Sequence, residues 1–484
     1  MIATLQPRSQ RWLPLMLLAL LAGCGGDDQI ARTGGSGTGV GTTIGTVNGF
    51  GSVIIESEAW DVRRARVEIE RTPAAGFAAA EVRLGQRVQV EYATRGNADR
   101  IVVEPEVIGR ISDIDPAGAA IGFRVAGQTV RVNTDPAAGP VTMLDGTAGL
   151  AGLQAGDVVD VHGSARFDAG LGRFVILASR VERRAALPDG LVRVAGVVTA
   201  YNATERRFRL GELTVTATAS TVQVPAGRAL ADGQRVVVWS ASAPGSGAAG
   251  PTLSADFIRI VEHRSSSGRN EVAGVLGRYD ASASTFEVAG VPVNARAANI
   301  VPASRSLAEG QYVIASGSFD NAGVLQAAQV RIRRGDAADN EIRLDGSITD
   351  FAGLTSFRVR DVAVNAAAVN SLPACPPAGL ANGLFVEVVG RINPAAARVD
   401  AERVRCVANP VGRVVTVTGA AAAVDLAARS FTLTPAGEPA RAVTWTTATF
   451  FEDISADMLA GQSVRVEAVD EGAALLALKI RRSP

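Results

Sequence analysis

A chain of 484 residues is too long to fold around one hydrophobic core, so the sequence predicts several domains. Apolar residues make up 47% of the chain, aromatic residues only 5%, and glycine occurs 52 times, which favours many short strands over long helices. The 48 basic residues balance the 48 acidic ones, and this neutrality argues against a nucleic-acid binder, because such proteins usually carry a strongly basic face.

The first residues are typical of a secretory signal peptide. Arg8 and Arg11 form a positively charged start, and the apolar stretch 12–22 is too short to span a bilayer. It ends in Leu21-Ala22-Gly23-Cys24, which resembles a lipobox. We therefore expect residues 1–23 to be removed as a lipoprotein signal peptide and Cys24 to be lipidated.

Residues 24–44 predict a lipidated cysteine followed by a flexible tether, because glycine and serine dominate the stretch from Gly34 to Gly39. Aspartate directly after the lipidated cysteine resembles an inner-membrane retention signal, but glycine occupies position 25. We expect a protein anchored in the outer membrane, on a face that the sequence leaves open.

Two landmarks recur through the rest of the chain. The pattern Gly-x-x-Val at the head of an apolar strand begins six times, at Gly85, Gly156, Gly233, Gly310, Gly383 and Gly461. Upstream of it, a glycine that opens one strand precedes a phenylalanine in the next strand, in the pairs Gly109/Phe123, Gly196/Phe208, Gly274/Phe286, Gly346/Phe357 and Gly419/Phe431. Internal repetition of this kind indicates an array of similar units.

Within each unit the apolar residues alternate with period two, and turn residues separate about five such runs. This predicts an all-β chain, a tandem array of about six small five-stranded barrel-like (OB-like) domains. The expected β repeats are 45–105, 106–186, 192–263, 270–334, 341–408 and 411–484.

The Gly49-Phe50-Gly51-Ser52-Val53-Ile54 strand, the paired landmarks and the lipobox together resemble a known family. It is the repeated domain-of-unknown-function family of proteobacterial envelope lipoproteins, and the resemblance covers roughly residues 45–483. The resemblance implies a barrel-like β domain and a location in the cell envelope. The family has no established activity, so it implies no functional residue.

The sequence offers no catalytic constellation. Its two histidines, His162 and His263, fall in different units, and we expect both at the surface near strand ends. Neither has a cysteine or carboxylate at the spacing of a metal site, and no Ser-His-Asp or Cys-His arrangement can be assembled. We therefore expect no enzyme, no metal and no cofactor.

Cys375 and Cys406 are the only cysteines besides Cys24, and both fall in the fifth unit. An exported protein meets an oxidising compartment, so we expect the two to form a disulfide. The alternative is that Cys406 is a buried free thiol.

Basic and apolar residues alternate in the last strand of several units. Arg331 and Arg333 in one unit, and Arg403 and Arg405 in the next, would each share one face of a strand. Such a face could bind phosphate or carboxylate groups of an envelope glycan, or be simply a solvated surface that protects a sheet edge.

These observations predict a non-catalytic envelope lipoprotein that acts as a scaffold, adhesion or ligand-binding module. The alternative is a polysaccharide-active enzyme with an unrecognised site between domains. The expected partners are the membrane, through the lipid anchor, and an envelope glycan or another envelope protein. Nucleic acid is not expected, because residues 24–484 carry 46 basic and 48 acidic residues.

Overall fold

The computed structural model describes residues 41–56, 58–115, 122–168, 170–247, 250–262 and 266–483. The predicted signal peptide, Cys24 and most of the tether lie outside the described residues, and so does His263. The described chain is all-β, as predicted, with one short helix, α1 (Ala337–Asn340), between the fourth and fifth repeats. No helix in these described ranges is both long and apolar enough to cross a membrane.

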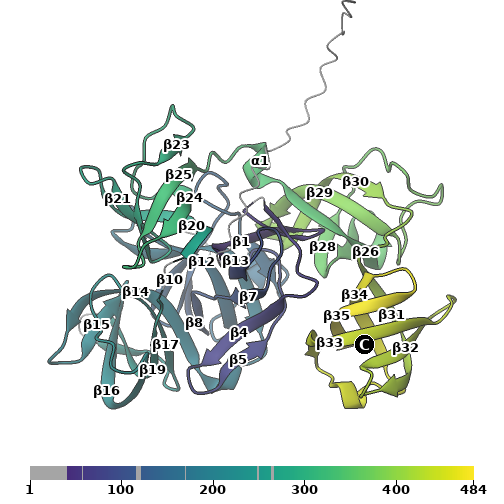
Figure 1. The fold of residues 1–484 in the computed structure, drawn as a ribbon, viewed down its shortest axis with the longest axis horizontal. Coiled ribbons are helices and arrows are strands. Elements are labelled where there is room, and N and C mark those ends of the chain that lie inside the picture. Colours follow the sequence, from purple (N-terminus) through teal and green to yellow (C-terminus); the bar gives the residue numbers. More distant parts are fainter. Residues whose placement is uncertain are drawn as a thin grey trace, which may run out of the picture. The chain divides into compact units, whose positions relative to one another are not determined.

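The sixth repeat is a closed five-stranded barrel (Figure 1). Its strands are β31 (Val414–Asp425), β32 (Ser430–Pro435), β33 (Arg441–Glu452), β34 (Ser463–Asp470) and β35 (Ala474–Arg482). Their order around the barrel is β31-β32-β33-β35-β34, and only the pair β33–β35 is parallel. This is the five-stranded arrangement of an OB-like barrel.

The same pairing recurs in the first three repeats when only the five strands that form the barrel are counted. The first barrel strand pairs with the second and the fourth, and the third pairs with the fifth in parallel. Repeat 1 contains β1 (Gly41–Phe50), β2 (Val53–Ile55), β3 (Glu58–Trp60), β4 (Arg66–Thr72), β5 (Gly76–Ala79), β6 (Arg87–Tyr92) and β7 (Arg100–Val103). Repeat 2 contains β8 (Val107–Asp115), β9 (Gly122–Val125), β10 (Gln128–Val132), β11 (Met143–Asp145), β12 (Val158–Asp168) and β13 (Arg173–Arg184). Repeat 3 contains β14 (Val192–Asn202), β15 (Arg207–Leu210), β16 (Leu213–Val224), β17 (Arg235–Ser240), β18 (Gly245–Gly247) and β19 (Gly250–Ile260).

The fourth and fifth repeats follow the same plan. Repeat 4 contains β20 (Ser266–Asp280), β21 (Thr285–Val288), β22 (Val291–Asn294), β23 (Asn299–Val301), β24 (Tyr312–Phe319) and β25 (Leu325–Ile332). Repeat 5 contains β26 (Ile342–Gly353), β27 (Ser356–Val359), β28 (Val362–Asn365), β29 (Phe385–Asn393) and β30 (Arg398–Cys406).

The Gly-x-x-Val landmark has one physical cause in all six repeats. Each of its glycines has a positive φ, between 75° and 93°, which is the left-handed region that favours glycine. In each repeat the amide of this glycine also donates to a carbonyl of the first strand, at 2.8 to 2.9 Å. The glycine therefore turns the chain into strand four and fixes strand four against strand one. The acceptors are Val47, Ile111, Val198, Leu276, Ile348 and Ala421.

The phenylalanine landmark marks the barrel cores. The five side chains lie in the second strand of their repeats and are at most 4% exposed: Phe123, Phe208, Phe286, Phe357 and Phe431. Some cores are shared between repeats. One apolar cluster joins repeats 1 and 5, and a second joins repeats 2 and 3.

Contacts between repeats do not follow chain order. The first strand of repeat 1 pairs in parallel with the first strands of two other repeats. Thr43 and Ile44 pair with β20, and Gly49 and Phe50 pair with β26. Repeats 1, 4 and 5 are therefore joined through backbone hydrogen bonds, although repeats 2 and 3 separate them in sequence.

An arginine-lined cavity

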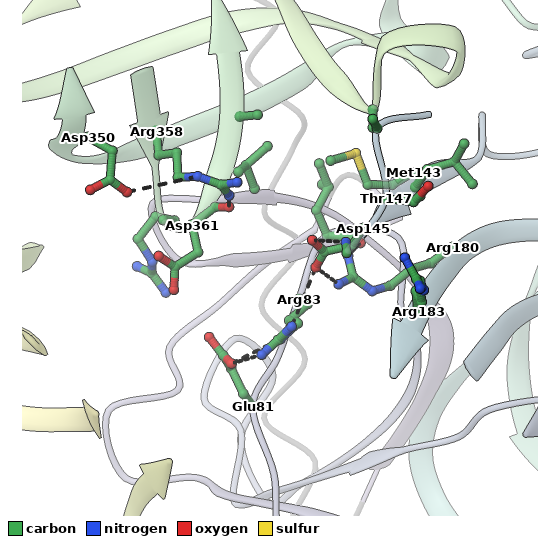
Figure 2. Close-up of a pocket in the computed structure, with 18 of the residues that line it drawn as sticks. Glu81, Arg83, Met143, Asp145, Thr147, Arg180, Arg183, Asp350, Arg358 and Asp361 are labelled. Carbon is green, nitrogen blue, oxygen red and sulfur yellow. Dashed lines mark hydrogen bonds and ion pairs between the residues drawn. The ribbon is translucent and has the colours of Figure 1, made fainter. Parts of the chain in front are cut away.

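Residues of four repeats line an open cavity of about 840 Å³. Its wall is formed by the loop after β5 in repeat 1, by β11 and β13 in repeat 2, by the β27–β28 hairpin in repeat 5, and by β34 and β35 in repeat 6. The charged residues in this wall are Arg83, Arg180, Arg183, Arg358, Arg360, Arg465, Arg481 and Arg482, with Glu81, Asp145, Asp350 and Asp361. Figure 2 shows Arg358 with Asp350 and Asp361 on one side of the cavity, and Arg180 and Arg183 with Asp145 on the other.

Carboxylates hold the arginines of the wall formed by repeats 1 and 2. The guanidinium of Arg180 is 3% exposed, donates to the carbonyl of Leu84 at 3.0 Å and forms an ion pair with Asp145. Arg83 forms ion pairs with Glu81 at 2.9 Å and with Asp145 at 3.4 Å. These contacts join the loop of repeat 1 to two strands of repeat 2, so the side chains on this wall are preorganised.

A tight turn positions the opposite wall. Arg360 and Asp361 connect β27 to β28 as a two-residue hairpin loop, with φ values of 52° and 59°. Such loops need positive φ at both central residues and usually contain glycine. The corresponding turns of repeats 2 and 4 read Ala126-Gly127 and Ala289-Gly290. Repeat 5 therefore accepts backbone strain where the other two repeats use glycine, and this turn presents charged side chains.

Both turn residues are tied to repeat 6. The Asp361 carboxylate accepts a hydrogen bond from Arg481 at 2.7 Å, and Arg360 forms an ion pair with Glu467 at 2.7 Å. The backbone oxygen of Asp361 also accepts a hydrogen bond from Arg358 at 2.5 Å. The hairpin of repeat 5 and the strands of repeat 6 thus form one charged surface.

A second pair on this wall is a two-point contact. Arg465 donates to the two carboxylate oxygens of Asp350 at 2.8 and 3.2 Å, a fork that matches the planar guanidinium to the carboxylate. These hydrogen bonds from Arg465 hold the pKa of Asp350 below its ordinary value. Asp350 is therefore ionised at neutral pH and acts as an acceptor.

Eight arginines and four carboxylates line the cavity, and four further carboxylates that are not among the lining residues pair with these arginines: Asp157, Glu182, Glu452 and Glu467. Three guanidiniums keep much of their surface exposed. Arg183 is 47% exposed and forms an ion pair with Asp157 at 3.1 Å, and Arg358 is 44% exposed and lies 3.9 Å from Asp350. Arg482 is exposed, with no carboxylate within 4 Å in the described chain. Arginine presents a planar set of donors that fits phosphate and carboxylate groups. The cavity is therefore suited to an anion.

The arginines predicted as a binding face are placed differently. Arg331 forms an ion pair with Asp339 at 2.9 Å, and Arg333 is 7% exposed and donates to the carbonyl of Pro136 in repeat 2 at 2.8 Å. The expected free face is therefore wrong for Arg333, because the end of its strand is covered by repeat 2. On β30, Arg403 and Arg405 are 66% and 56% exposed and form ion pairs with Glu341 and Glu387. None of these four residues lines the cavity.

The structure also places the remaining predicted residues. Cys375 and Cys406 form a disulfide, which ties the link between strands three and four of repeat 5 to the last strand of that repeat. Among the described residues, no three histidines, cysteines or carboxylates are grouped as metal ligands.

The expectation of a surface histidine is wrong for His162. Its side chain is fully buried where repeats 1 and 2 meet, next to Asp160 and the backbone of Arg87. Both faces of this part of β12 are covered, since Asp160, Val161 and His162 are all fully buried.

Fold and cavity together define a tandem array of OB-like barrels with an arginine-lined cavity between repeats. A comparison with family models identifies the family to which the repeats belong. The chain belongs to the family described as Domain of unknown function (DUF5666), whose model matches residues 108–182, 195–249, 274–331 and 411–481, more than half of the chain. The matched segments fall in repeats 2, 3, 4 and 6, and repeats 1 and 5 show the same strand pairing.

Solved structures resemble parts of the chain. The crystal structure of Ag(I)CusF is 23% identical, covers 15% of this chain and 99% of its own, and has a TM-score of 0.13. A structure of CusF-Ag(I) from Escherichia coli has the same identity, coverage of this chain and TM-score, with 96% of its own chain covered. The structure titled drosophila Unr CSD456 is 12% identical, covers 44% of this chain and 97% of its own, and also has a TM-score of 0.13. No curated protein matches the sequence.

Proposed function

We propose that this protein is a non-catalytic binding module that takes an anionic ligand, bearing phosphate or carboxylate groups, in the arginine-lined cavity. The observation that carries the proposal is the exposure of three arginines, Arg183, Arg358 and Arg482, in one cavity. Their planar guanidinium donors fit phosphate and carboxylate groups. The cavity also lies within the size range of small-molecule sites.

The alternative is an enzyme that acts on a polysaccharide, since four carboxylates line the same cavity. A glycosidase of the usual type needs one carboxylic acid that stays protonated near neutral pH. Here hydrogen bonds from Arg465 lower the pKa of Asp350, and each of the other three carboxylates is bound to an arginine. This arrangement favours binding over hydrolysis.

The proposal also includes the location of the protein in the cell envelope. The apolar leader and Leu21-Ala22-Gly23-Cys24 support a lipoprotein anchored in the outer membrane through Cys24. Mass spectrometry of the mature N-terminus tests this, with a lipid-modified Cys24 as the expected result. An unmodified N-terminus at another residue would reject it.

Calorimetric titration of the full chain in detergent with tripolyphosphate tests the cavity. In the triple variant Arg183→Gln, Arg358→Gln, Arg482→Gln, we expect the affinity to fall at least tenfold. The matched control removes three exposed arginines outside the cavity: Arg343→Gln, Arg403→Gln, Arg405→Gln. Its affinity should stay within twofold of the parent protein, and equal losses in both variants would reject the cavity as the site.

A further inference from the structure

We infer that the ligand of the cavity is an acidic oligosaccharide, a chain of sugar residues with spaced anionic groups, which bridges repeat 2 to repeats 5 and 6. This inference rests on the proposed function. Three properties of the cavity carry it: the distribution of its exposed arginines, the carboxylates between them, and the chemical nature of the rest of the wall.

The exposed arginines of the cavity belong to three different repeats. Arg183 lies on β13 of repeat 2, Arg358 on β27 of repeat 5, and Arg482 on β35 of repeat 6. Figure 2 shows Arg183 and Arg358 on opposite sides of the cavity. The space of about 840 Å³ is far larger than one small ion needs, because a water molecule takes about 30 Å³ in the liquid. A ligand that meets both sides must therefore carry at least two anionic groups, set apart from each other.

The carboxylates of the cavity argue against a bare polyanion. Asp145, Asp350 and Asp361 keep 31% to 47% of their side-chain surface exposed while they are bound to arginines. An ionised carboxylate accepts hydrogen bonds and cannot donate them, and it repels phosphate. Hydroxyl groups are its natural partners. A ligand with hydroxyls between its anionic groups satisfies both kinds of side chain, and sugar acids have this composition.

The rest of the wall argues against a nucleic acid. It is built from small or aliphatic residues such as Leu84, Met143 and Val362, and no aromatic side chain lines it. Proteins that bind single-stranded nucleic acid usually stack the bases on aromatic rings. The cavity instead offers guanidinium donors, which bind anionic groups, and carboxylate acceptors, which bind hydroxyls.

The test uses oligogalacturonates of one to six residues, neutral maltooligosaccharides of the same lengths, and tripolyphosphate, all titrated into the full chain. We expect no binding of the neutral series. We expect affinity for oligogalacturonates to rise at least tenfold from the monomer to the length that reaches both walls, and then to level off. Arg183→Gln should abolish this rise, and Arg183→Lys, which keeps the charge, should restore part of it.

The outcomes separate the two proposals. If galacturonate monomers and longer oligomers bind equally, the bridging inference is wrong and the proposed anion site stands. If tripolyphosphate binds more tightly than trigalacturonate, charge density alone is recognised and the saccharide assignment is wrong. If no anion binds, both proposals fail. Release of reducing ends during the titration would support the alternative enzyme and overturn the non-catalytic function.

Discussion

The backbone N–H of Arg87 donates a hydrogen bond to the Nδ1 atom of His162 at 3.2 Å, and this bond joins β6 of repeat 1 to β12 of repeat 2. An imidazole that accepts at Nδ1 carries its proton on Nε2, and Nε2 faces the Oδ1 atom of Asp160 at 3.4 Å. Burial lowers the pKa of His162 to about 4, against the opposing attraction of Asp160. The histidine is therefore neutral in the folded protein.

We predict that this contact between repeats 1 and 2 loses stability at acidic pH. The folded pKa lies below the unfolded value of 6.5, so protons bind the unfolded chain more tightly. The stability that this effect supports is complete above pH 6.5 and is lost as the pH falls from 6.5 towards 4, by at most about 3 kcal/mol. In His162→Asn, whose side-chain oxygen can replace Nδ1 as acceptor, we expect a smaller loss between pH 7.5 and pH 5. Urea unfolding at both pH values measures it, and equal losses in both proteins would contradict the assignment.

A second prediction concerns a glycine in strand four. Gly317 lies at a β-bulge, where a Cβ atom would come within 2.0 Å of the Gln326 carbonyl oxygen. Gly163 and Gly390 occupy the same position in repeats 2 and 5, with backbone oxygens at 2.2 and 2.3 Å. Gly317→Ala should therefore destabilise repeat 4 by about 2 kcal/mol or more, because neither strand can move away without breaking its pairing.

The control for this substitution is Gly277→Ala in the same repeat. There a Cβ atom would meet only the carboxylate end of Glu309, at 3.6 Å, and the backbone φ is ordinary. We expect a change within about 0.5 kcal/mol. Thermal unfolding followed by circular dichroism compares the two variants, and similar melting curves would show that the close approach at Gly317 is relieved at little cost.

The repeats could be predicted from the sequence because each landmark has a local cause. The glycine of Gly-x-x-Val supplies a positive φ, and the phenylalanine fills the barrel core, so both recur wherever a barrel is built. Contacts between repeats leave no such pattern. Arg333 alternates with an apolar residue as an exposed strand residue would, yet repeat 2 covers it.

The cavity could not be predicted for the same reason. Its ion pairs join residues as far apart as Arg83 and Glu452, and no spacing in the sequence records that contact. Two local signals existed. One is the turn Arg360-Asp361, where repeats 2 and 4 have Ala-Gly. The other is Lys479, the only lysine of the chain, which is 6% exposed and bound to Glu81 and Glu452.

The disulfide of repeat 5 leads to a third prediction. It closes a loop with a sequence separation of 31 between Cys375 and Cys406, and a loop of that length restricts the unfolded chain. The double variant Cys375→Ser, Cys406→Ser should lose about 3 kcal/mol of stability in repeat 5. Melting curves with and without reductant test this: reductant should lower the melting temperature of the parent protein and leave the variant unchanged. Alkylation of both thiols in unreduced protein would show that the bond is absent in solution.

The last prediction concerns separability. A cut after Leu187 leaves repeats 1 and 2 in one piece and repeats 3 to 6 in the other, so every barrel keeps its strands. The pieces would nevertheless share contacts. Glu106 of repeat 2 and Arg235 of repeat 3 form a buried ion pair at 2.8 Å, and β1 pairs with β20 and β26 across the cut. We therefore expect two folded pieces that associate in a one-to-one complex when they are produced together.

Two comparisons make this prediction specific. Glu106→Ala should weaken the complex strongly, because it leaves the buried Arg235 without its carboxylate, a change that typically costs 3–5 kcal/mol. A cut at Gly227, in the loop between β16 and β17, separates strands three and four of one barrel and exposes unpaired edges, so its fragments should aggregate. Light scattering of the co-purified pieces gives the answer. If the pieces from the cut after Leu187 remain separate at micromolar concentration, the strand pairing between repeats does not hold them together, and each of the two pieces is an independent body.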